Sequence, residues 1–365
     1  MTSETESEFL TLHEFVKAAK GLLTPGNWDY LVGATETETT MMRNRMALDS
    51  LAFRPRVLRD VSAIDTSTTF LGRRLALPVL LAPVGGLESF DPEGGAPAAR
   101  ACAAFGVPIM VSSVSHPGLH PMADAAGSGS KVFQLYVRGD AAWVDEIARQ
   151  AIDAGYDAFC LTVDTAIYSR RERDIAKRFV KPWRTRAQGH GFQAALCWDD
   201  VKRFKDRHRI PLALKGIATA EDAVLACEHG VEIVYVSNHG GRQLDHGRGA
   251  MDVLPEVVKA VAGRARIWID GGFSRGSDIV KAMALGADLV GLGRLYCYAL
   301  AAAGEAGVTR MLELLQEEVN EVMGLLGVTS FAQLDPSYLH PVSPAVPAHV
   351  HSAFPLTNLA DPGYR

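Results

Sequence analysis

The segment from Val236 to Asp245, "VSNHGGRQLD", places a histidine and an arginine three residues apart with two glycines between them. Apolar residues lead into it, as at the end of a buried strand. A neutral histidine can act as a general base, and an arginine can hold a carboxylate through two parallel hydrogen bonds. A lone histidine is usually structural, but this one ends an apolar run in a cation-rich context. We therefore interpret His239 and Arg242 as a base and an anion clamp for one small molecule.

Three further charged residues follow other apolar runs. Asp164 is a candidate to orient the His239 ring and stabilise its protonated form, although a helix or loop cap is an alternative. Arg171 is a candidate for a second clamp on the same carboxylate, although as part of "RRERD" it could be a solvated surface charge. Lys215 has two functional interpretations, a Schiff-base lysine or a positive charge beside a cofactor ring. The residues alone do not decide between them.

Two glycine-rich segments predict a phosphate site. "DGGFSRG" (270–276) and "GLGR" (291–294) each follow a predicted strand. Glycines let backbone N–H groups approach an anion, and the N-terminus of a following helix favours negative charge. Each motif alone is equally consistent with ordinary turns. Their positions after two consecutive strands make the phosphate interpretation stronger.

A recurring pattern indicates how these residues are positioned. Four amphipathic segments end in glycine, where a left-handed C-cap is expected, and a continuous apolar run follows each of them. In all, the sequence predicts eight parallel strands alternating with helices, at Pro78–Ala82, Pro108–Ser112, Val132–Tyr136, Ala158–Val163, Pro211–Lys215, Ile233–Ser237, Arg266–Asp270 and Leu289–Leu292. This favours an α/β fold of the (β/α)8 TIM-barrel class, in which the chemistry lies at the C-terminal ends of the strands. A doubly wound open sheet is the alternative.

The remaining segments flank the barrel. Residues 1–75 are predicted to form an N-terminal helical cap and lead-in, with helices at Leu12–Leu23 and Thr35–Asp49. The barrel itself is expected at 76–335, with a loop at 181–200 that could act as a lid. Residues 336–365 form a proline-rich C-terminal extension, which we interpret either as an arm over a neighbouring subunit or as disordered.

Composition excludes several function classes. The 365-residue chain has a net charge of −5, so it has no basic footprint for nucleic acid. No apolar run reaches the roughly 18 residues of a membrane helix, and the start "MTSETESEFL" does not resemble a secretory signal. The five cysteines are scattered without C-x-x-C spacing, which argues against disulfides and a structural metal site and favours a cytoplasmic protein.

These motifs resemble the FMN-dependent α-hydroxy acid oxidase and dehydrogenase family, which includes glycolate oxidase, lactate oxidase and mandelate dehydrogenase. "SNHGGRQLD" is similar to that family's active-site motif, and the resemblance extends roughly over Thr11–Thr329. Other segments match in order and spacing, namely "FRPRVLRDVS", "LAPVGG", "FQLYV", "LTVDT", "SRRERDIAKRF", "LKGI", "DGGFSRG" and "GLGR".

The resemblance implies FMN as cofactor, a 2-hydroxy acid as substrate, oxygen or another electron acceptor, and a homotetramer. It implies that His239 is the base with Asp164 as its partner, that Arg171 and Arg242 bind the substrate carboxylate, and that Lys215 lies beside the flavin rather than forming a Schiff base. Tyr136 and Tyr30 would contact the substrate. Flavin-contacting positions would be Pro83, Val84, Gly85, Ser112, Gln134, Thr162 and Ser237, and ribityl or phosphate contacts Asp270, Gly271, Gly272, Arg275, Gly293 and Arg294.

Several positions depart from the family pattern. "DYLVGA" is one residue short around Tyr30, and Ser274 stands where an arginine commonly meets the phosphate, a role that Arg275 would take over. Gly85 and Val114 replace larger residues of glycolate oxidase, which predicts a substrate larger than glycolate. Oxidation of an amine or a modified peptide, and a non-catalytic flavin-binding protein, are the alternatives. The residues decide neither between oxidase and dehydrogenase nor how the α-hydrogen leaves.

Overall fold

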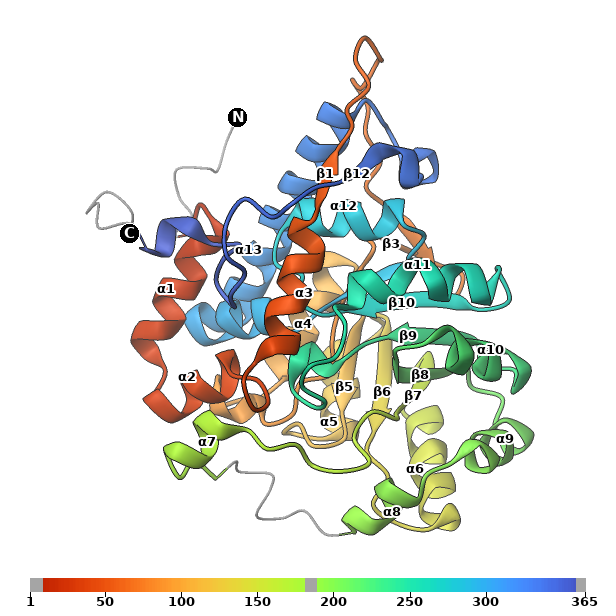
Figure 1. Cartoon of the computed structure of the whole chain (residues 1–365). Coiled ribbons are helices and arrows are strands. Elements are labelled where there is room, and N and C mark those ends of the chain that lie inside the picture. The colour runs from red at the N-terminus through yellow and green to blue at the C-terminus, as the bar shows by residue number, and fades with distance from the viewer. Residues whose placement is uncertain (1–8, 181–188, 359–365) are drawn as a thin grey trace.

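The computed structural model describes residues 9–180 and 189–358. Eight parallel strands form a closed barrel in the order of the chain, and helices surround it (Figure 1). This confirms the predicted (β/α)8 architecture. The barrel strands are β4 (Val79–Leu81), β5 (Ile109–Ser112), β6 (Lys131–Leu135), β7 (Ala158–Thr162), β8 (Leu212–Ile217), β9 (Ile233–Val236), β10 (Arg266–Asp270) and β11 (Leu289–Leu292).

Left-handed glycines end the helices that precede four of these strands. Gly106, Gly155, Gly230 and Gly286 have φ angles of 88°, 74°, 71° and 98°, a region that residues with a Cβ seldom adopt. The chain can therefore turn sharply from each helix into the next strand, as the sequence predicts. The helices around the barrel are α4 (Ala96–Phe105), α5 (Leu119–Ala126), α6 (Ala141–Asp153), α7 (Glu172–Ala176), α8 (His190–Ala195), α9 (Trp198–Arg207), α10 (Ala220–Glu228), α11 (Ala250–Val261), α12 (Gly276–Ala284) and α13 (Arg294–Leu326).

A short hairpin closes the end of the barrel opposite the predicted site. It consists of β2 (Thr68–Phe70) and β3 (Arg73–Leu75). Phe70 is buried against Trp268 inside the barrel, with 5.6 Å between ring centroids. Residues alternating along the strands fill the interior with apolar side chains, so the barrel is a packed core rather than a pore.

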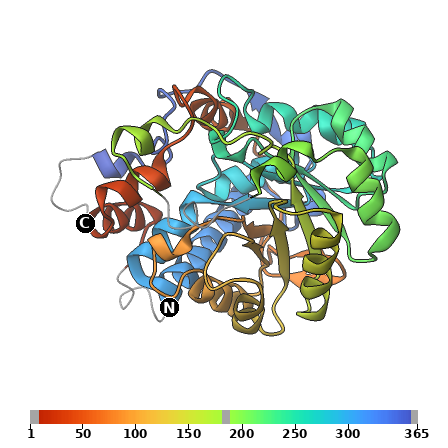
Figure 2. The same ribbon diagram turned by 90° about the horizontal axis from the view of Figure 1, so that it is seen from below.

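Three helices from the N-terminal segment lie beside the opposite, C-terminal mouth of the barrel: α1 (Leu12–Leu22), α2 (Pro25–Val32) and α3 (Thr39–Asp49) (Figures 1 and 2). The first and third agree with the predicted helices, except that α3 begins four residues later. Helix α2 was not predicted. The side chain of Thr24 accepts a hydrogen bond from the backbone N–H of Asn27, and Pro25 occupies the first turn, which together form a standard helix start.

Two predictions about connecting segments need correction. The loop predicted at 181–200 contains α8 and the start of α9, where the Asp200 carboxylate accepts the backbone N–H of Cys197 at 3.0 Å; residues 181–188 lie outside the described residues. The C-terminal extension is folded onto its own chain as far as residue 358. Its strand β12 (Leu339–Pro341) pairs with β1 (Leu51–Phe53), and the short helix at Pro355–Asn358 lies beside α1.

Candidate active site

A cavity of about 540 Å³ opens at the C-terminal mouth of the barrel. Most of the residues predicted to bind cofactor or substrate line it, whereas Asp164, Ser112, Gln134, Thr162, Ser237 and Arg275 are not among the lining residues. The predicted residues that line the cavity are Tyr30, Pro83, Val84, Gly85, Tyr136, Arg171, Lys215, His239, Arg242, Asp270, Gly271, Gly272, Gly293 and Arg294.

His239 and Asp164 form a pair at this mouth. The His239 Nδ1 lies 3.1 Å from the Asp164 Oδ1, so Nε2 is directed to the other side of the ring. Burial lowers the pKa of His239 below 6.5; Asp164 opposes this change, while Lys215 and Arg171 reinforce it. Burial alone would raise the pKa of Asp164, but His239 and Lys215 bring it below its usual value. The pair is therefore a neutral imidazole held by a carboxylate, as a general base requires.

One tyrosine contacts this imidazole, and a second lies beside Arg242. The Tyr136 hydroxyl lies 3.4 Å from the His239 Nε2, and burial raises the pKa of Tyr136, so its hydroxyl remains a hydrogen-bond donor. Tyr30 does reach the cavity, despite the shortened motif around it. Its hydroxyl donates to the Gly85 carbonyl at 2.7 Å, and its ring lies 5.0 Å from the guanidinium carbon of Arg242.

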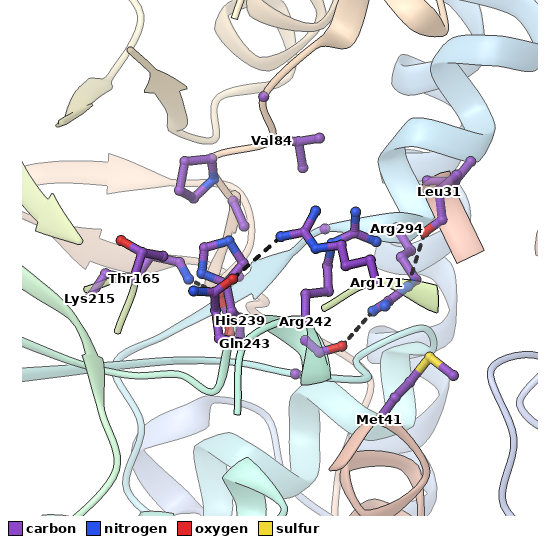
Figure 3. Close-up of a pocket in the computed structure, with 18 of the residues that line it drawn as sticks. Leu31, Met41, Val84, Thr165, Arg171, Lys215, His239, Arg242, Gln243 and Arg294 are labelled. Carbon is purple, nitrogen blue, oxygen red and sulfur yellow. Dashed lines mark hydrogen bonds and ion pairs between the residues drawn. The ribbon is translucent and has the colours of Figure 1, made fainter. Parts of the chain in front are cut away.

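Three arginines converge beside the histidine (Figure 3). Nη1 of Arg242 donates to the carbonyls of Tyr30 and Gly33, both at 2.8 Å, while Nη2 and Nε form no hydrogen bond with the described chain. Arg294 donates from all three nitrogens to the carbonyls of Leu31, Gly33 and Gly240. The carbonyl end of α2, which carries partial negative charge, thus holds both side chains. The edge of the Arg242 guanidinium formed by Nε and Nη2 is therefore available to bind an anion.

Arg171 is the third arginine of this group. It is 8% exposed, which excludes the interpretation as a solvated surface charge. Its contacts with the Ser169 hydroxyl and the Gln243 side chain are long, at 3.4 and 3.5 Å. Burial lowers the pKa of Arg242, and repulsion from the neighbouring cations Arg171 and Arg294 lowers it further, while Asp174 opposes this change. An anion bound here would relieve that repulsion. Gln243, which also donates to the Asp164 carbonyl, belongs to the opening motif but was not predicted as a site residue.

A second charged network lies at the ends of β8, β9 and β10. The Lys215 ammonium donates to the Ser237 hydroxyl at 2.8 Å and lies 3.2 Å from the Asp270 carboxylate, and Ser237 donates to Asp270 at 2.6 Å. Burial on its own would lower the pKa of Lys215, but Asp270 and Asp164 raise it. This lysine is therefore a fixed positive charge. A Schiff base would need a neutral amine, so the network supports the other interpretation of Lys215.

Backbone geometry explains the glycines of the opening motif. His239 itself has φ of 59°, and Gly240 and Gly241 have φ of 62° and 77°. A Cβ at Gly241 would lie 2.5 Å from the backbone nitrogen of Met41 in α3. The glycines therefore allow the sharp turn that was predicted, and Gly241 also allows α3 to pack closely against it. A non-glycine residue in the left-handed region, such as His239, is strained, and such strain concentrates at functional sites.

Gly216 is a site residue that the sequence reasoning missed. It forms an irregularity in the pairing of β8 with β9, between Lys215 and Ile217, and its φ is 119°. A Cβ on this residue would lie 2.7 Å from the Cβ of Asp164. The bulge aims Lys215 and leaves space for Asp164 on the adjacent strand end. The available signal was a glycine directly after the predicted strand Pro211–Lys215, which the structure extends to Ile217.

We expect Gly216→Ala to lower kcat about 10²-fold, because the added methyl displaces Asp164 and misorients His239. Gly263→Ala is a matched control, since Gly263 has φ of 77° but no atom within 4 Å of an added Cβ. Both variants should lose about 1–2 kcal/mol of stability from backbone strain, measured by denaturant unfolding. Gly216→Ala should lose about 1–3 kcal/mol more, because its added Cβ meets Asp164 at 2.7 Å. Only Gly216→Ala should lose activity; equal activity of the two variants would contradict this role for Gly216.

Buried polar atoms test whether FMN fits the site. Both side-chain polar atoms of Gln134 and the Thr162 hydroxyl are buried, with no hydrogen-bond partner in the described chain. They end adjacent strands, where Ser112 pairs in register with Gln134 and Thr162 with Lys215. Buried polar groups rarely remain unsatisfied, so this row indicates a polar ligand. The heterocyclic edge of a flavin offers both donors and acceptors, and the residues fit it.

The glycines after β10 and β11 fit the phosphate end. Gly271 and Gly272 have φ of 116° and 84° and line the cavity, and a Cβ on Gly293 would meet no atom within 4 Å. Arg275, however, does not line the cavity. Its guanidinium lies 2.5 Å from the Glu318 carboxylate and donates to the Ala353 carbonyl at 3.3 Å. Ser274 lines the cavity at this position instead.

Comparison with known proteins agrees with this geometry. The model of the FMN-dependent dehydrogenase family matches residues 19–341. An L-lactate oxidase from Nostoc sp. is 37% identical over 357 residues, which cover 91% of this chain and 98% of the relative. Glycolate oxidase 1 from Zea mays is 39% identical over 349 residues, covering 90% of this chain and 94% of the relative.

A solved structure of a mandelate oxidase with benzoyl-formic acid superposes with a TM-score of 0.85 at 38% identity, and the match covers 93% of this chain and all of that one. In the part of this chain that the structure describes, no helix is long and apolar enough to cross a bilayer. The match to the family model over most of the chain confirms the resemblance seen in the motifs and the assignment of FMN as cofactor. The chain belongs to the FMN-dependent dehydrogenase family and is an FMN-dependent oxidoreductase.

Proposed function

We propose that this protein oxidises an (S)-2-hydroxy acid to the corresponding 2-oxo acid. One observation carries the proposal: a neutral imidazole, two arginines with unused N–H groups and a tyrosine hydroxyl face one cavity. A carboxylate and the adjacent hydroxyl-bearing carbon are one bond apart, so a base and a clamp that act on them must lie this close together.

The arginines would bind the carboxylate. The free Nη2 and Nε edge of Arg242 suits a bidentate contact, and Arg171 adds charge from the opposite side. The tyrosines would orient the substrate, with the Tyr136 hydroxyl beside the same Nε2 that takes the proton. These contacts would bring the α-carbon next to His239 and would determine which face of the carbon is presented. That defines the expected preference for one enantiomer.

His239 would accept the hydroxyl proton at Nε2 as the substrate is oxidised. Asp164 would stabilise the imidazolium that forms, since it already lies at Nδ1. Bound FMN supplies the two-electron acceptor for this oxidation. Lys215 provides a positive charge at the floor of the cavity, held in place by Ser237 and Asp270, where it would favour an anionic reduced cofactor.

We further propose a substrate larger than glycolate. Apolar side chains form part of the cavity wall, and the small residues Gly85 and Val114 lie among them. A hydrophobic substituent gains about 0.8 kcal/mol for each CH₂ group that it buries. The likeness to the mandelate oxidase structure also supports a substrate larger than glycolate. Other apolar residues lining the cavity are Val84, Phe90, Ala166 and Ile167.

We expect mandelate or a longer aliphatic 2-hydroxy acid to reduce the bound flavin with kcat/KM about 10-fold or more above that of glycolate. The measurement is anaerobic flavin reduction with a panel of 2-hydroxy acids, followed by admission of air to time reoxidation, which separates an oxidase from a dehydrogenase. Val114→Trp should lower kcat/KM for the larger acids more than for glycolate. A preference for glycolate in the unmodified protein would refute the larger substrate.

The proposal extends to a cytoplasmic homotetramer that passes electrons to oxygen or to another acceptor. All five cysteines are free thiols, which supports a reducing compartment. The tetramer rests on family resemblance, and sedimentation of the purified protein tests it.

A further inference from the structure

The C-terminal segment 349–354 forms a compact turn over the cavity mouth. Phe354 is 1% exposed and packs edge-on against His13 of α1. His351 packs against the rings of both Trp28 and Tyr298, 5.5 and 6.0 Å from their centroids, and its Nε2 is 3.2 Å from the Tyr298 hydroxyl. In both views the segment lies beside the N-terminal helices (Figures 1 and 2). It lies beyond residue 341, where the match to the family model ends.

Arg275 anchors this turn. It was predicted to contact phosphate, but its guanidinium binds Glu318 and the Ala353 carbonyl instead. Glu318 also accepts the backbone N–H of Gly276 at 2.7 Å, so the start of α12, the middle of α13 and the C-terminal turn are joined at one point. Arg275 therefore acts on the turn rather than on the cavity.

The anchored turn brings His349 and Val350 into the lining of the cavity, together with Ser274, Gly293 and Arg294. Ser274, Gly293 and Arg294 follow the seventh and eighth barrel strands, β10 and β11, where barrels commonly bind phosphate. Helix α13 begins at Arg294, and the N-terminus of a helix favours an anion. Three of the five N–H groups of Arg294 already donate to carbonyls, which leaves two for the three terminal oxygens of a phosphate. This end of the cavity therefore needs further donors to satisfy a dianionic phosphate.

His349 has such a donor. Its Nδ1 accepts the backbone N–H of His351 at 3.1 Å, which fixes the neutral ring as the tautomer protonated at Nε2. That Nε2–H forms no hydrogen bond within the described chain. We propose that residues 349–354 form a C-terminal clasp on the cofactor site, in which His349 donates from Nε2 to the phosphate of FMN and Arg275 positions the clasp. The proposal depends on FMN binding and not on which hydroxy acid is oxidised.

Binding of FMN and of riboflavin, which lacks the phosphate, tests this proposal. The full-length protein is stripped of cofactor and titrated with each ligand by flavin fluorescence. We expect His349→Ala to raise the Kd for FMN about 10-fold, ~1.4 kcal/mol, as for loss of one hydrogen bond to a charged group. The Kd for riboflavin should stay within about twofold. His340→Ala is the matched control, because His340 is an exposed histidine on β12 that does not line the cavity.

A second set of variants tests the anchoring role of Arg275. Arg275→Met should weaken FMN binding and leave riboflavin binding unchanged. The double variant His349→Ala/Arg275→Met should bind FMN no more than about twofold more weakly than His349→Ala alone, because both substitutions remove the same contact with the phosphate. Unchanged FMN binding in His349→Ala, or equal losses for FMN and riboflavin, would overturn the phosphate contact. Additive losses would show that Arg275 reaches the phosphate itself and overturn its role as an anchor. If Arg275→Met fails to fold, His349→Ala still tests the phosphate contact, because His349 is exposed and its replacement should leave the fold intact.

Discussion

Replacing His239 with alanine is expected to slow substrate-driven flavin reduction about 10³-fold while leaving the protein yellow. The variant loses the group that we propose as the acceptor of the hydroxyl proton, but it keeps Gln134, Lys215 and the glycine loops that fit the cofactor. Anaerobic stopped-flow absorbance at the flavin band measures the rate, and the flavin-to-protein absorbance ratio measures retention.

His120→Ala is the matched control, since His120 is an exposed histidine on α5 outside the cavity. Its rate should equal that of the unmodified protein. A His239→Ala variant that reduces its flavin at the normal rate would remove His239 from the chemistry. An unmodified protein that keeps its flavin oxidised with every acid in the panel would instead support the non-catalytic alternative.

The same base sets the expected pH dependence. His239 must be neutral to accept a proton, and its pKa lies below the usual 6.5 because burial, Lys215 and Arg171 outweigh Asp164. The active form therefore predominates above that lowered pKa, and kcat/KM should fall only as the pH drops through it. Asp164→Asn removes a negative charge that raises the pKa of His239, so it should move this acid limb to still lower pH while reducing kcat.

The sequence predicted the elements and the chemical groups because both leave local patterns. Glycine C-caps and continuous apolar runs mark the helix-to-strand turns of a parallel barrel, and the strand ends then bring His239 and Asp164 together although they are 75 residues apart. The short helix α2 was missed because its start depends on Thr24 and Pro25 rather than on an apolar period. Yet α2 supplies the carbonyls that hold two active-site arginines.

Contacts between distant segments could not be predicted in the same way. Nothing local to "DGGFSRG" shows that Arg275 turns toward Glu318, because the partner lies 43 residues away. Likewise, a proline-rich extension without a period gives no sign that Phe354 and His351 find aromatic neighbours near the barrel mouth. Gly216 is an intermediate case. A glycine directly after a predicted strand was visible in the sequence, but the reason for it is the side chain of Asp164 beside the end of the neighbouring strand.

Arg242→Met should lower kcat/KM for a 2-hydroxy acid about 10³-fold, because truncating one partner of a buried charge pair costs 2–5 kcal/mol or more. The substrate carboxylate would lose its bidentate partner, and Arg171 offers only one guanidinium to replace it. Steady-state kinetics measure the loss. Arg248→Met is the matched control, since Arg248 lies six residues further along the same loop and pairs with Glu256 at the surface, where such a pair contributes little.

A change of substrate separates carboxylate binding from general damage to the site. The carboxamide of the same hydroxy acid carries no charge, so the unmodified protein should turn it over poorly and Arg242→Met should lower that rate less than about 10-fold. In the free protein, burial lowers the pKa of Arg242 and repulsion from Arg171 lowers it further. Part of the affinity for an anion therefore comes from relief of that repulsion, which a neutral amide cannot supply. Equal losses for acid and amide would mean that Arg242 shapes the cavity through its contacts with Tyr30 and Gly33 and does not bind the carboxylate.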